Sequence, residues 1–266
     1  TCHADLSTYA LYEVNEVEFP SGAELTFGEA EAANLCLQCH QGRSSANTVN
    51  EAIEGLDPDE VSEDLGFLNI HYFAAGATLF GAEAQGAYQY DGKEYLGKNA
   101  HVPGFDTCIG CHNAHELEVE VEECSACHTG VASAEDLEAI RLSTEDYDGD
   151  GDTEEGIAGE VETMREALYE ALQDYAAEVT AAEAIIYNSA SYPYFFIDAN
   201  GNGEVDEDEA DRYNTWTPRL LQGAYNYQYA NKDPGAYAHN GQYVLQVLYD
   251  SLEDLEADVS GMTRPE

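Results

Sequence analysis

The chain contains 266 residues, and its 54 acidic and 9 basic side chains give a formal net charge of −45 at pH 7. A charge of this sign repels nucleic-acid phosphates and anionic lipid headgroups, so neither is an expected partner. Hydrophobic residues make up 44% of the chain, which argues against a disordered acidic tail, and no apolar run is long enough to span a membrane. High salt or bound calcium would relieve the self-repulsion of such a chain.

One cysteine pattern recurs along the chain. Its copies are Cys2 and His3 as the end of the first, Cys36, Cys39 and His40 as the second, Cys108, Cys111 and His112 as the third, and Cys124, Cys127 and His128 as the fourth. C-x-x-C-H is the attachment pattern of c-type haem, in which two thiols bond to the porphyrin and the histidine ligates the iron. A zinc site needs four converging ligands and does not require a histidine after every second cysteine. The pattern therefore predicts four covalently attached haem c groups.

Four further histidines lie outside these motifs, and they are His71, His101, His115 and His239. Four motif histidines and four others are the set that four six-coordinate, bis-histidine haems require, so we predict all eight as iron ligands. The sequence does not assign each additional histidine to a particular haem. His115 follows His112 by only three residues, which is too short to pass around a porphyrin, so we expect it to serve a neighbouring haem.

In chain order, the first predicted element is a short helix over residues 30–41 that carries the second motif. Residues 51–66 are acidic and contain an Asp-Pro step, so we expect a loop there. The apolar stretch 68–81 contains His71 and suits a segment that packs against a porphyrin face. Residues 87–97 place two short aromatic strands around Asp-Gly, which predicts a small β-hairpin whose tyrosines pack either on haem edges or at the surface.

The second half of the chain contains no cysteine and has helical periodicity. Apolar residues at three- and four-residue spacing predict an amphipathic helix over residues 159–179. Thr217 followed by Pro218 is typical of a helix start, which predicts a second helix through residue 232. A third helix is expected over residues 240–257, with His239 at its beginning. If this half holds a haem, it does so through His239.

Residues 198–209 match the twelve-residue calcium loop of EF-hand proteins. The predicted ligands are Asp198, Asn200, Asn202, the backbone carbonyl of Glu204, Asp206 and a bidentate Glu209. Calcium prefers six to eight hard oxygen ligands, and this spacing lets one loop surround the ion. A solvated acidic turn is the alternative. The stretch before the loop is extended rather than helical, so we interpret it as a structural clip and not as a sensor.

A second acidic cluster fits only the first half of the same pattern. Its predicted calcium ligands are Asp146, Asp148, Asp150, Asp152 and Glu155. The twelfth position is occupied by Ile157, so either Glu155 or Glu160 would have to close the site. The sequence therefore predicts one or two Ca²⁺ ions.

Together, these motifs resemble the multihaem c-type cytochromes of anaerobic and metal-respiring prokaryotes. Residues 146–157, 193–204, 216–221 and 233–243 look like the C-terminal region of large exported members of that group. The resemblance implies an extracellular or cell-surface protein, with the periplasm as the second choice, and in some members polymerisation into conductive filaments. The chain departs from the pattern at Thr1, where the first cysteine of the first motif is missing, so we expect the numbering to begin after processing or after a further portion.

The leading functional hypothesis is electron transfer through closely spaced, low-spin haems, by an electron carrier rather than an enzyme. Its partners would be other redox proteins, extracellular electron acceptors, or copies of itself in a homo-polymer or larger cytochrome assembly. One alternative is a multihaem oxidoreductase that reduces nitrogen or sulfur oxyanions at one open iron. Another is a calcium-clamped structural module.

The predicted fold class is mainly α with extensive irregular loops. We expect a loop-rich haem-binding region with a small β-hairpin over residues 1–135, and a helical region with both acidic loops over residues 136–266. The first region has few long elements, so we expect the porphyrins to supply much of its apolar core.

Overall fold

The computed structural model describes residues 2–180, 184–203, 205, 206, 209 and 211–266. The first third has short elements only: β1 (His3–Asp5), β2 (Ala10–Leu11), β3 (Val17–Glu18), β4 (Glu24–Leu25), α1 (Asn34–His40), α2 (Ala46–Ile53), α3 (Ala75–Phe80) and the 3-10 helix η1 (Gly81–Glu83). The middle holds α4 (Cys108–Cys111), α5 (Val121–Cys124) and the 3-10 helix η2 (Glu135–Ala139). The longer elements follow: α6 (Ile157–Glu178), β5 (Ala184–Tyr187), β6 (Phe195–Asp198), α7 (Pro218–Asn231) and α8 (Ala236–Asp254).

The result is a mixed, loop-rich architecture. In the described part of the chain, strands pair only as antiparallel two-stranded hairpins, β1 with β2, β3 with β4 and β5 with β6. Helix α1 confirms the predicted helix under the second motif, and α6, α7 and α8 confirm the three predicted in the second half. Residues 51–53, predicted as loop, instead form the last turn of α2.

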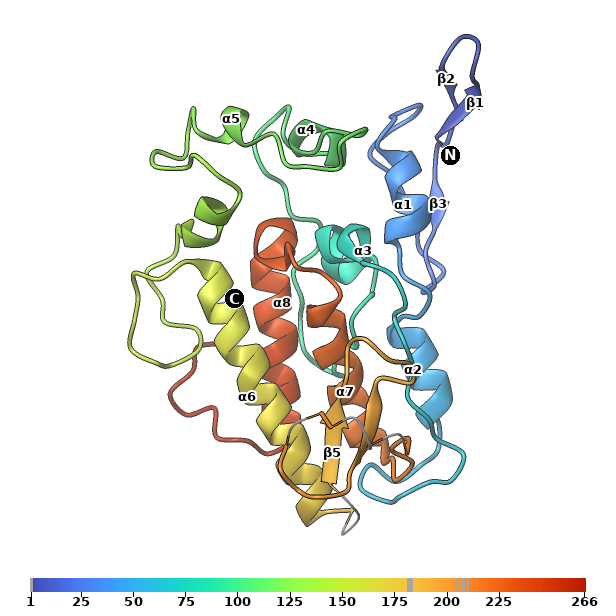
Figure 1. The fold of residues 1–266 in the computed structure, drawn as a ribbon, viewed down its shortest axis with the longest axis vertical. Coiled ribbons are helices and arrows are strands. Elements are labelled where there is room, and N and C mark those ends of the chain that lie inside the picture. The colour runs from blue at the N-terminus through green and yellow to red at the C-terminus, as the bar shows by residue number, and fades with distance from the viewer. Residues whose placement is uncertain (1, 181–183, 204, 207–208, 210) are drawn as a thin grey trace.

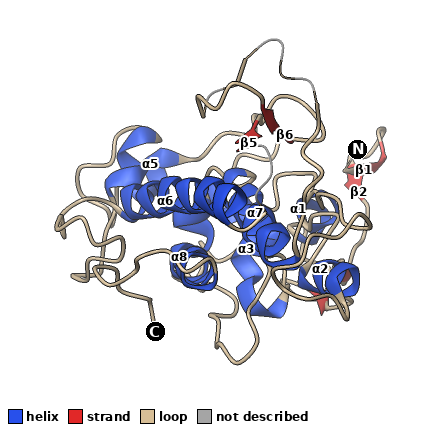
Figure 2. Cartoon of the chain, turned by 90° about the horizontal axis from the view of Figure 1, so that it is seen from below, coloured by secondary structure: helices blue, strands red, loops and turns tan. Residues whose placement is uncertain are grey.

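Helices α6, α7 and α8 pack against one another at the centre of the molecule (Figures 1 and 2). Their facing rows are apolar and fully buried, as at Leu168 and Leu172 of α6, Leu220 of α7, and Val244 and Leu248 of α8. Burying each such side chain stabilises the fold by about 1.5–3 kcal/mol relative to leaving it exposed. This helical core is therefore built from the chain's own side chains.

Helix α7 is the most enclosed of the three. Its first residue is Pro218, and the hydroxyl of Thr217 accepts a hydrogen bond from the Leu220 backbone N–H at 3.1 Å. Such a cap satisfies one of the free N–H groups at a helix start, as the sequence predicted. Eleven of the 14 residues of α7 are buried, so the helix is covered on all sides.

The predicted hairpin over residues 87–97 forms its turn but not its strands. Gly92 has φ of 79°, which a tight turn requires, yet the flanking residues form no strand ladder. Side-chain amides of the helical core replace the ladder, because Tyr88 N–H donates to Asn226 Oδ1 at 2.7 Å and Leu96 N–H donates to Gln246 Oε1 at 2.8 Å. The segment is therefore fixed to α7 and α8, which a local sequence pattern does not indicate.

Residues 100–130, which we call the motif segment, lie at one end of the helical core and pass over α3 and the start of α8 (Figure 1). None of these residues is buried. One apolar cluster elsewhere combines Phe19 and Phe80 with Trp216, so packing crosses the predicted boundary at residue 135. The division into two regions stays a prediction about where the haem motifs lie.

Candidate haem and cation sites

Short helical turns present the motif cysteines. Cys36 and Cys39 lie on α1, Cys108 and Cys111 begin and end α4, and Cys124 ends α5. Residues three apart in a helix share one face, so both thiols of the second motif, and both of the third, can reach one ligand. Cys127 of the fourth motif lies in a turn after α5. All seven cysteines lie in the described part of the chain, and none forms a disulfide.

Three motif histidines each face one of the four histidines outside the motifs. The pairs and their ring-centroid separations are His3 with His115 at 6.2 Å, His128 with His101 at 6.1 Å, and His112 with His239 at 6.3 Å. An imidazole nitrogen bonds a first-row metal at about 2 Å and lies about 1 Å from its ring centroid, so two axial imidazoles on one iron have centroids about 6 Å apart. The residues present therefore fit three bis-histidine haems. Each pair also combines one motif histidine with one other.

Hydrogen bonds fix the outer nitrogen of several of these rings. His3 Nδ1 lies 2.8 Å from the Tyr9 carbonyl, and His40 Nδ1 lies 2.9 Å from the Phe73 carbonyl. A carbonyl only accepts, so Nδ1 carries the proton in both rings. The other nitrogen, Nε2, is then left with the lone pair that a metal requires.

His71 differs from the other three additional histidines. It is exposed, its backbone has φ of 82°, and its ring lies 4.4 Å from the Tyr72 ring. Its segment nevertheless reaches the second motif, because His40 binds the carbonyl of Phe73, two residues further along. The structure thus brings the 71–73 backbone to His40 without placing the two rings face to face.

The third motif lies between the second and the fourth. The Cys36 and Cys108 thiols share a hydrogen bond, which lowers the pKa of Cys36 to about 7 and raises that of Cys108. Burial, and then the charge of Cys124, raises the pKa of Cys111. Motifs that are 72 residues apart in sequence, such as those beginning at Cys36 and Cys108, therefore touch.

His112 lies at the centre of this arrangement. Burial, followed by the charges of His239 and His40, lowers the pKa of His112. His239 reaches it from the kinked start of α8, where Asn240 leaves the helical conformation with φ of −168° and donates from Nδ2 to the Gly97 carbonyl at 3.0 Å. The kink has an identifiable cause, because that side chain is bound to the neighbouring loop.

A carboxylate also holds His239. Its Nδ1 lies 2.8 and 2.9 Å from the two oxygens of Asp233, which is 3% exposed. Burial lowers the pKa of His239, but the charge and hydrogen bond of Asp233 outweigh it and the pKa is raised. Asp233 belongs to none of the sequence motifs. The one feature of the sequence that could have pointed to Asp233 is its place in the turn just before the helix that carries His239.

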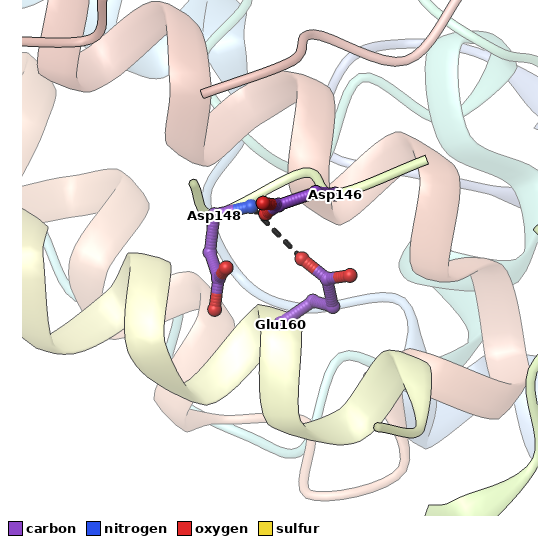
Figure 3. A group of neighbouring side chains, drawn as sticks. All are labelled: Asp146, Asp148 and Glu160. Carbon is purple, nitrogen blue, oxygen red and sulfur yellow. Dashed lines mark hydrogen bonds between the residues drawn. The ribbon is translucent and has the colours of Figure 1, made fainter. Parts of the chain in front are cut away.

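The first acidic loop folds back onto α6. Figure 3 shows Asp146 and Asp148 of the loop beside Glu160 of the helix, with one oxygen of each within 4.8 Å of the others. The Glu160 carboxylate is already occupied, because it accepts the backbone N–H groups of Tyr147 and Asp148 at 2.9 and 2.8 Å and pairs with Arg141. Arg141 therefore neutralises the carboxylate that would otherwise compete to close the site.

Unlike Glu160, Glu155 has a carboxylate oxygen without a hydrogen-bond partner. Oxygens of Asp148, Asp150 and Glu155 also lie within 4.8 Å of one another, and Asp148 Oδ2 and Glu155 Oε1 are buried without a hydrogen-bond partner. Burial, and then the charge of Asp148, raises the pKa of Glu155 to about 7. Burial also raises the pKa of Asp148. Asp152 is exposed and shapes the turn by accepting the Glu155 backbone N–H at 3.2 Å. Buried, unpaired carboxylate oxygens fit a hard cation.

The second loop turns the described members of its predicted ligand set toward one another. Asp198 is 5% exposed and accepts backbone N–H groups of the loop at 2.7 Å on each oxygen. Asp206 Oδ2 accepts the side-chain amides of Asn200 and Asn202 at 2.7 and 2.9 Å, and its own N–H donates to Glu209 Oε2 at 3.1 Å. The predicted ligand Glu204 lies outside the described residues.

Two curated proteins are similar to the chain over most of its length. The C-type polyheme cytochrome OmcB of Geobacter sulfurreducens is 28% identical over 268 residues, and OmcC of the same species is 26% identical over 268 residues. Each alignment covers 86% of this chain but only 32% and 31% of the respective relative. The chain thus spans about a third of the length of the curated relatives it matches. No family model matches it, and no solved structure does.

The motifs, the histidine pairs and these relatives together support a multihaem c-type cytochrome with haem c as its cofactor. Of the helices in the described ranges, none is long and apolar enough to cross a membrane.

Proposed function

We propose that this chain transfers single electrons through four closely spaced haem c groups, each held by two histidines. The observation that carries the proposal is the pairing of His3, His112 and His128 with three histidines outside the motifs, at separations of 6.1–6.3 Å. The bound cofactor supplies a reversible one-electron couple. Two imidazoles on each iron leave no open position for a substrate, which supports a carrier over an enzyme.

The fourth pair follows from the residues that remain. His40 is the motif histidine without a facing ring, and His71 is the remaining histidine outside the motifs. The hydrogen bond from His40 to Phe73 supports this pairing, because it ties the 71–73 segment to the second motif. His71 would then be the second histidine ligand of a haem on Cys36 and Cys39.

The protein contributes to the redox reaction through ligand geometry and charge. Rings fixed at Nδ1 keep the same orientation in both oxidation states, so little structure reorganises when an electron moves. The negative charge of the chain, −45 before any propionates, stabilises Fe(III) over Fe(II). We therefore expect low reduction potentials.

The proposal extends to where the protein acts and to its electron-transfer partners. Covalent haem attachment takes place outside the cytoplasmic membrane, which supports an extracellular or cell-surface protein, with the periplasm as the second choice. The acidic surface suits exchange with other redox proteins or with extracellular electron acceptors. Assembly of copies into a filament rests on the sequence resemblance, and His71 is the ligand through which it can be tested.

The first test is the spin state of the dilute, ferric, haem-loaded protein, measured by EPR with the haem content from a pyridine haemochrome. We expect four low-spin haems per chain and no high-spin signal. Replacing His71 with alanine should then convert one haem of the four to high spin, and His101→Ala should do the same at a different haem.

Other results would change the conclusion. A high-spin haem in the unaltered protein that disappears on concentration would mean that a neighbouring copy supplies the missing histidine, in favour of the polymer. A high-spin haem that persists and responds to nitrite or sulfite would overturn the carrier proposal in favour of an oxyanion reductase. Low-spin spectra unchanged by either alanine variant would overturn the ligand assignments.

We also propose that both acidic loops bind Ca²⁺ as structural clips. In the first loop, the support comes from the unpaired oxygens of Asp148 and Glu155 and from the neutralisation of Glu160 by Arg141. Glu155 is thus the residue that closes the site. Its carboxylate lies over Gly159, where an added Cβ would come within 1.9 Å of Glu155 Oε2.

Two substitutions with a matched control test this assignment by calorimetric Ca²⁺ titration. Glu155→Gln and Gly159→Ala should each weaken one of the calcium sites by roughly tenfold or more, because one removes the carboxylate and the other displaces it. Glu154→Gln removes the same charge one residue earlier and should change the affinity little. Equal effects of Glu154→Gln and Glu155→Gln would mean that only the general negative charge matters.

A further inference from the structure

His239 differs from the motif histidines His3 and His40 in what holds its outer nitrogen. Both oxygens of Asp233 lie within 2.9 Å of His239 Nδ1, whereas His3 and His40 are held by the backbone carbonyls of Tyr9 and Phe73. A carboxylate carries a full negative charge, and hydrogen bonds to it are shorter and about twice as strong as those to a neutral acceptor.

Asp233 is buried next to the His239 ring. Asp233 is 3% exposed, lies in the turn between α7 and α8, and also accepts the Gly235 backbone N–H at 3.2 Å. In the part of the chain that the structure describes, its ion-pair partner is His239. A buried carboxylate whose charge is not neutralised by Lys or Arg acts strongly on its neighbour.

We propose that Asp233 is the positioning residue that makes the haem of the third motif, on His112 and His239, the lowest in potential of the four. The inference rests on the proposed function, because it requires His239 to be an iron ligand. The Nδ1–H group of His239 donates a hydrogen bond to the Asp233 carboxylate. This hydrogen bond makes the other ring nitrogen, Nε2, more electron-rich. A more basic Nε2 stabilises Fe(III) more than Fe(II), so the iron becomes harder to reduce.

The low potential of this haem would affect electron transfer because the third motif lies among the other three. Cys108 of the third motif is a hydrogen-bond neighbour of Cys36 in the second, and Cys111 is near enough to Cys124 of the fourth for their charges to interact. His115, which faces His3 of the first motif, follows His112 by three residues. The third motif therefore joins the other three, and an electron passing between them meets the least favourable step at this junction.

The test uses the full, haem-loaded protein and follows its four reduction potentials by spectroelectrochemistry, with EPR of partly reduced samples. Asp233→Asn should shift one potential in the positive direction and change one low-spin EPR signal, while three potentials stay unchanged. Asp233→Glu keeps the charge but displaces the carboxylate by one methylene, so it should shift the same potential by a smaller amount than Asp233→Asn does. Asp106→Asn is the matched control, because it removes one exposed charge two residues before Cys108 without touching a histidine.

Each outcome decides the question. Four unchanged potentials, an equal shift of all four, or the same shift in Asp106→Asn would overturn the proposal. A new high-spin haem in Asp233→Asn would support it, because the carboxylate would then be shown to hold the ligand in place. If Asp233→Asn does not fold, Asp233→Glu still has to move that one potential relative to the unaltered protein, since its carboxylate is displaced by one methylene, and no movement would overturn the inference.

Failure of the underlying function is recognised separately. His239→Ala must convert one low-spin haem to high spin if His239 is a ligand at all. An unchanged spectrum in that variant would remove the proposed function at this haem, whatever Asp233 does.

Discussion

The helical core and the motif segment are neighbours, yet different forces hold them. In α6, α7 and α8, leucine, valine and tyrosine side chains are buried against one another, and the chain needs no cofactor for that packing. Residues 100–130 bury no side chain and contain only single helical turns, at α4 and α5. A helical turn of that length is not stable alone. We therefore expect the core to order itself, and the motif segment to be ordered by what is attached to it.

The largest expected effect comes from removing the attachment points. A variant with all seven cysteines replaced by serine should lose its haems and keep the helical signal of α6–α8 in circular dichroism. A glutamate-specific protease should cut it between residues 116 and 123, at least about tenfold faster than the haem-loaded protein, because the segment opens locally. Equal resistance of the two proteins would mean that the motif segment is ordered by its own contacts.

A smaller effect is expected from a charged group buried in the core. Asp250 of α8 has a fully buried side chain, and Arg264 binds both of its oxygens at 2.8 and 2.9 Å. Arg264→Ala removes the bidentate partner of the carboxylate and leaves Lys93 as its cation, 3.4 Å away, so we expect a loss of about 3 kcal/mol in the free energy of unfolding. Chemical denaturation followed by circular dichroism measures this loss.

Lys93 provides the control for that measurement. Its side chain is 35% exposed, so Lys93→Ala should cost less than about 1 kcal/mol. The haem spectra of both variants should match those of the unaltered protein, because neither residue contacts a motif. A change in the haem spectra without a change in stability would contradict the separation of the two regions.

The smallest effect is expected at the start of α7. Thr217→Ala removes the acceptor of the Leu220 N–H and should lower the free energy of unfolding by about 1 kcal/mol. Thr217→Ser keeps the hydroxyl and should stay within a few tenths of a kcal/mol of the unaltered protein. If the two variants are equally destabilised, the lost methyl packing rather than the cap accounts for the effect.

The sequence correctly predicted structural features that depend on residues close together in the chain. The cysteine motifs predict haem c, which the relatives support. Apolar spacing predicted α6 and α8, and the Thr217–Pro218 step predicted the start of α7 with its cap. These features depend on residues a few positions apart, which share one helical turn or one attachment site. The acidic loops are of the same kind, and their proposed calcium ligands remain to be measured.

The hairpin at 87–97 shows where local patterns stop. A turn forms at Asp91 and Gly92, but only Gly92 has positive φ, so it is not the type I′ turn that the Asp-Gly pair favours. The strands lost their ladder to Asn226 and Gln246, more than 130 residues away in the chain. Two of the three histidine pairs are similarly non-local. His3 and His115, or His112 and His239, are over 100 residues apart and meet only through the fold.

The amino-acid sequence by itself determined which chemical groups the protein carries: the thiols and histidines for haem, the acidic loops, and the helices that form a core. Only the tertiary structure decided which histidine faces which, which motif lies between the others, and which ligand rests on a buried carboxylate. The physical reason is the sequence separation over which each kind of interaction acts. Motif spacing and helical periodicity act over a few residues, whereas a pair of axial ligands, or an aspartate beneath one of them, is brought together by the packing of the whole chain.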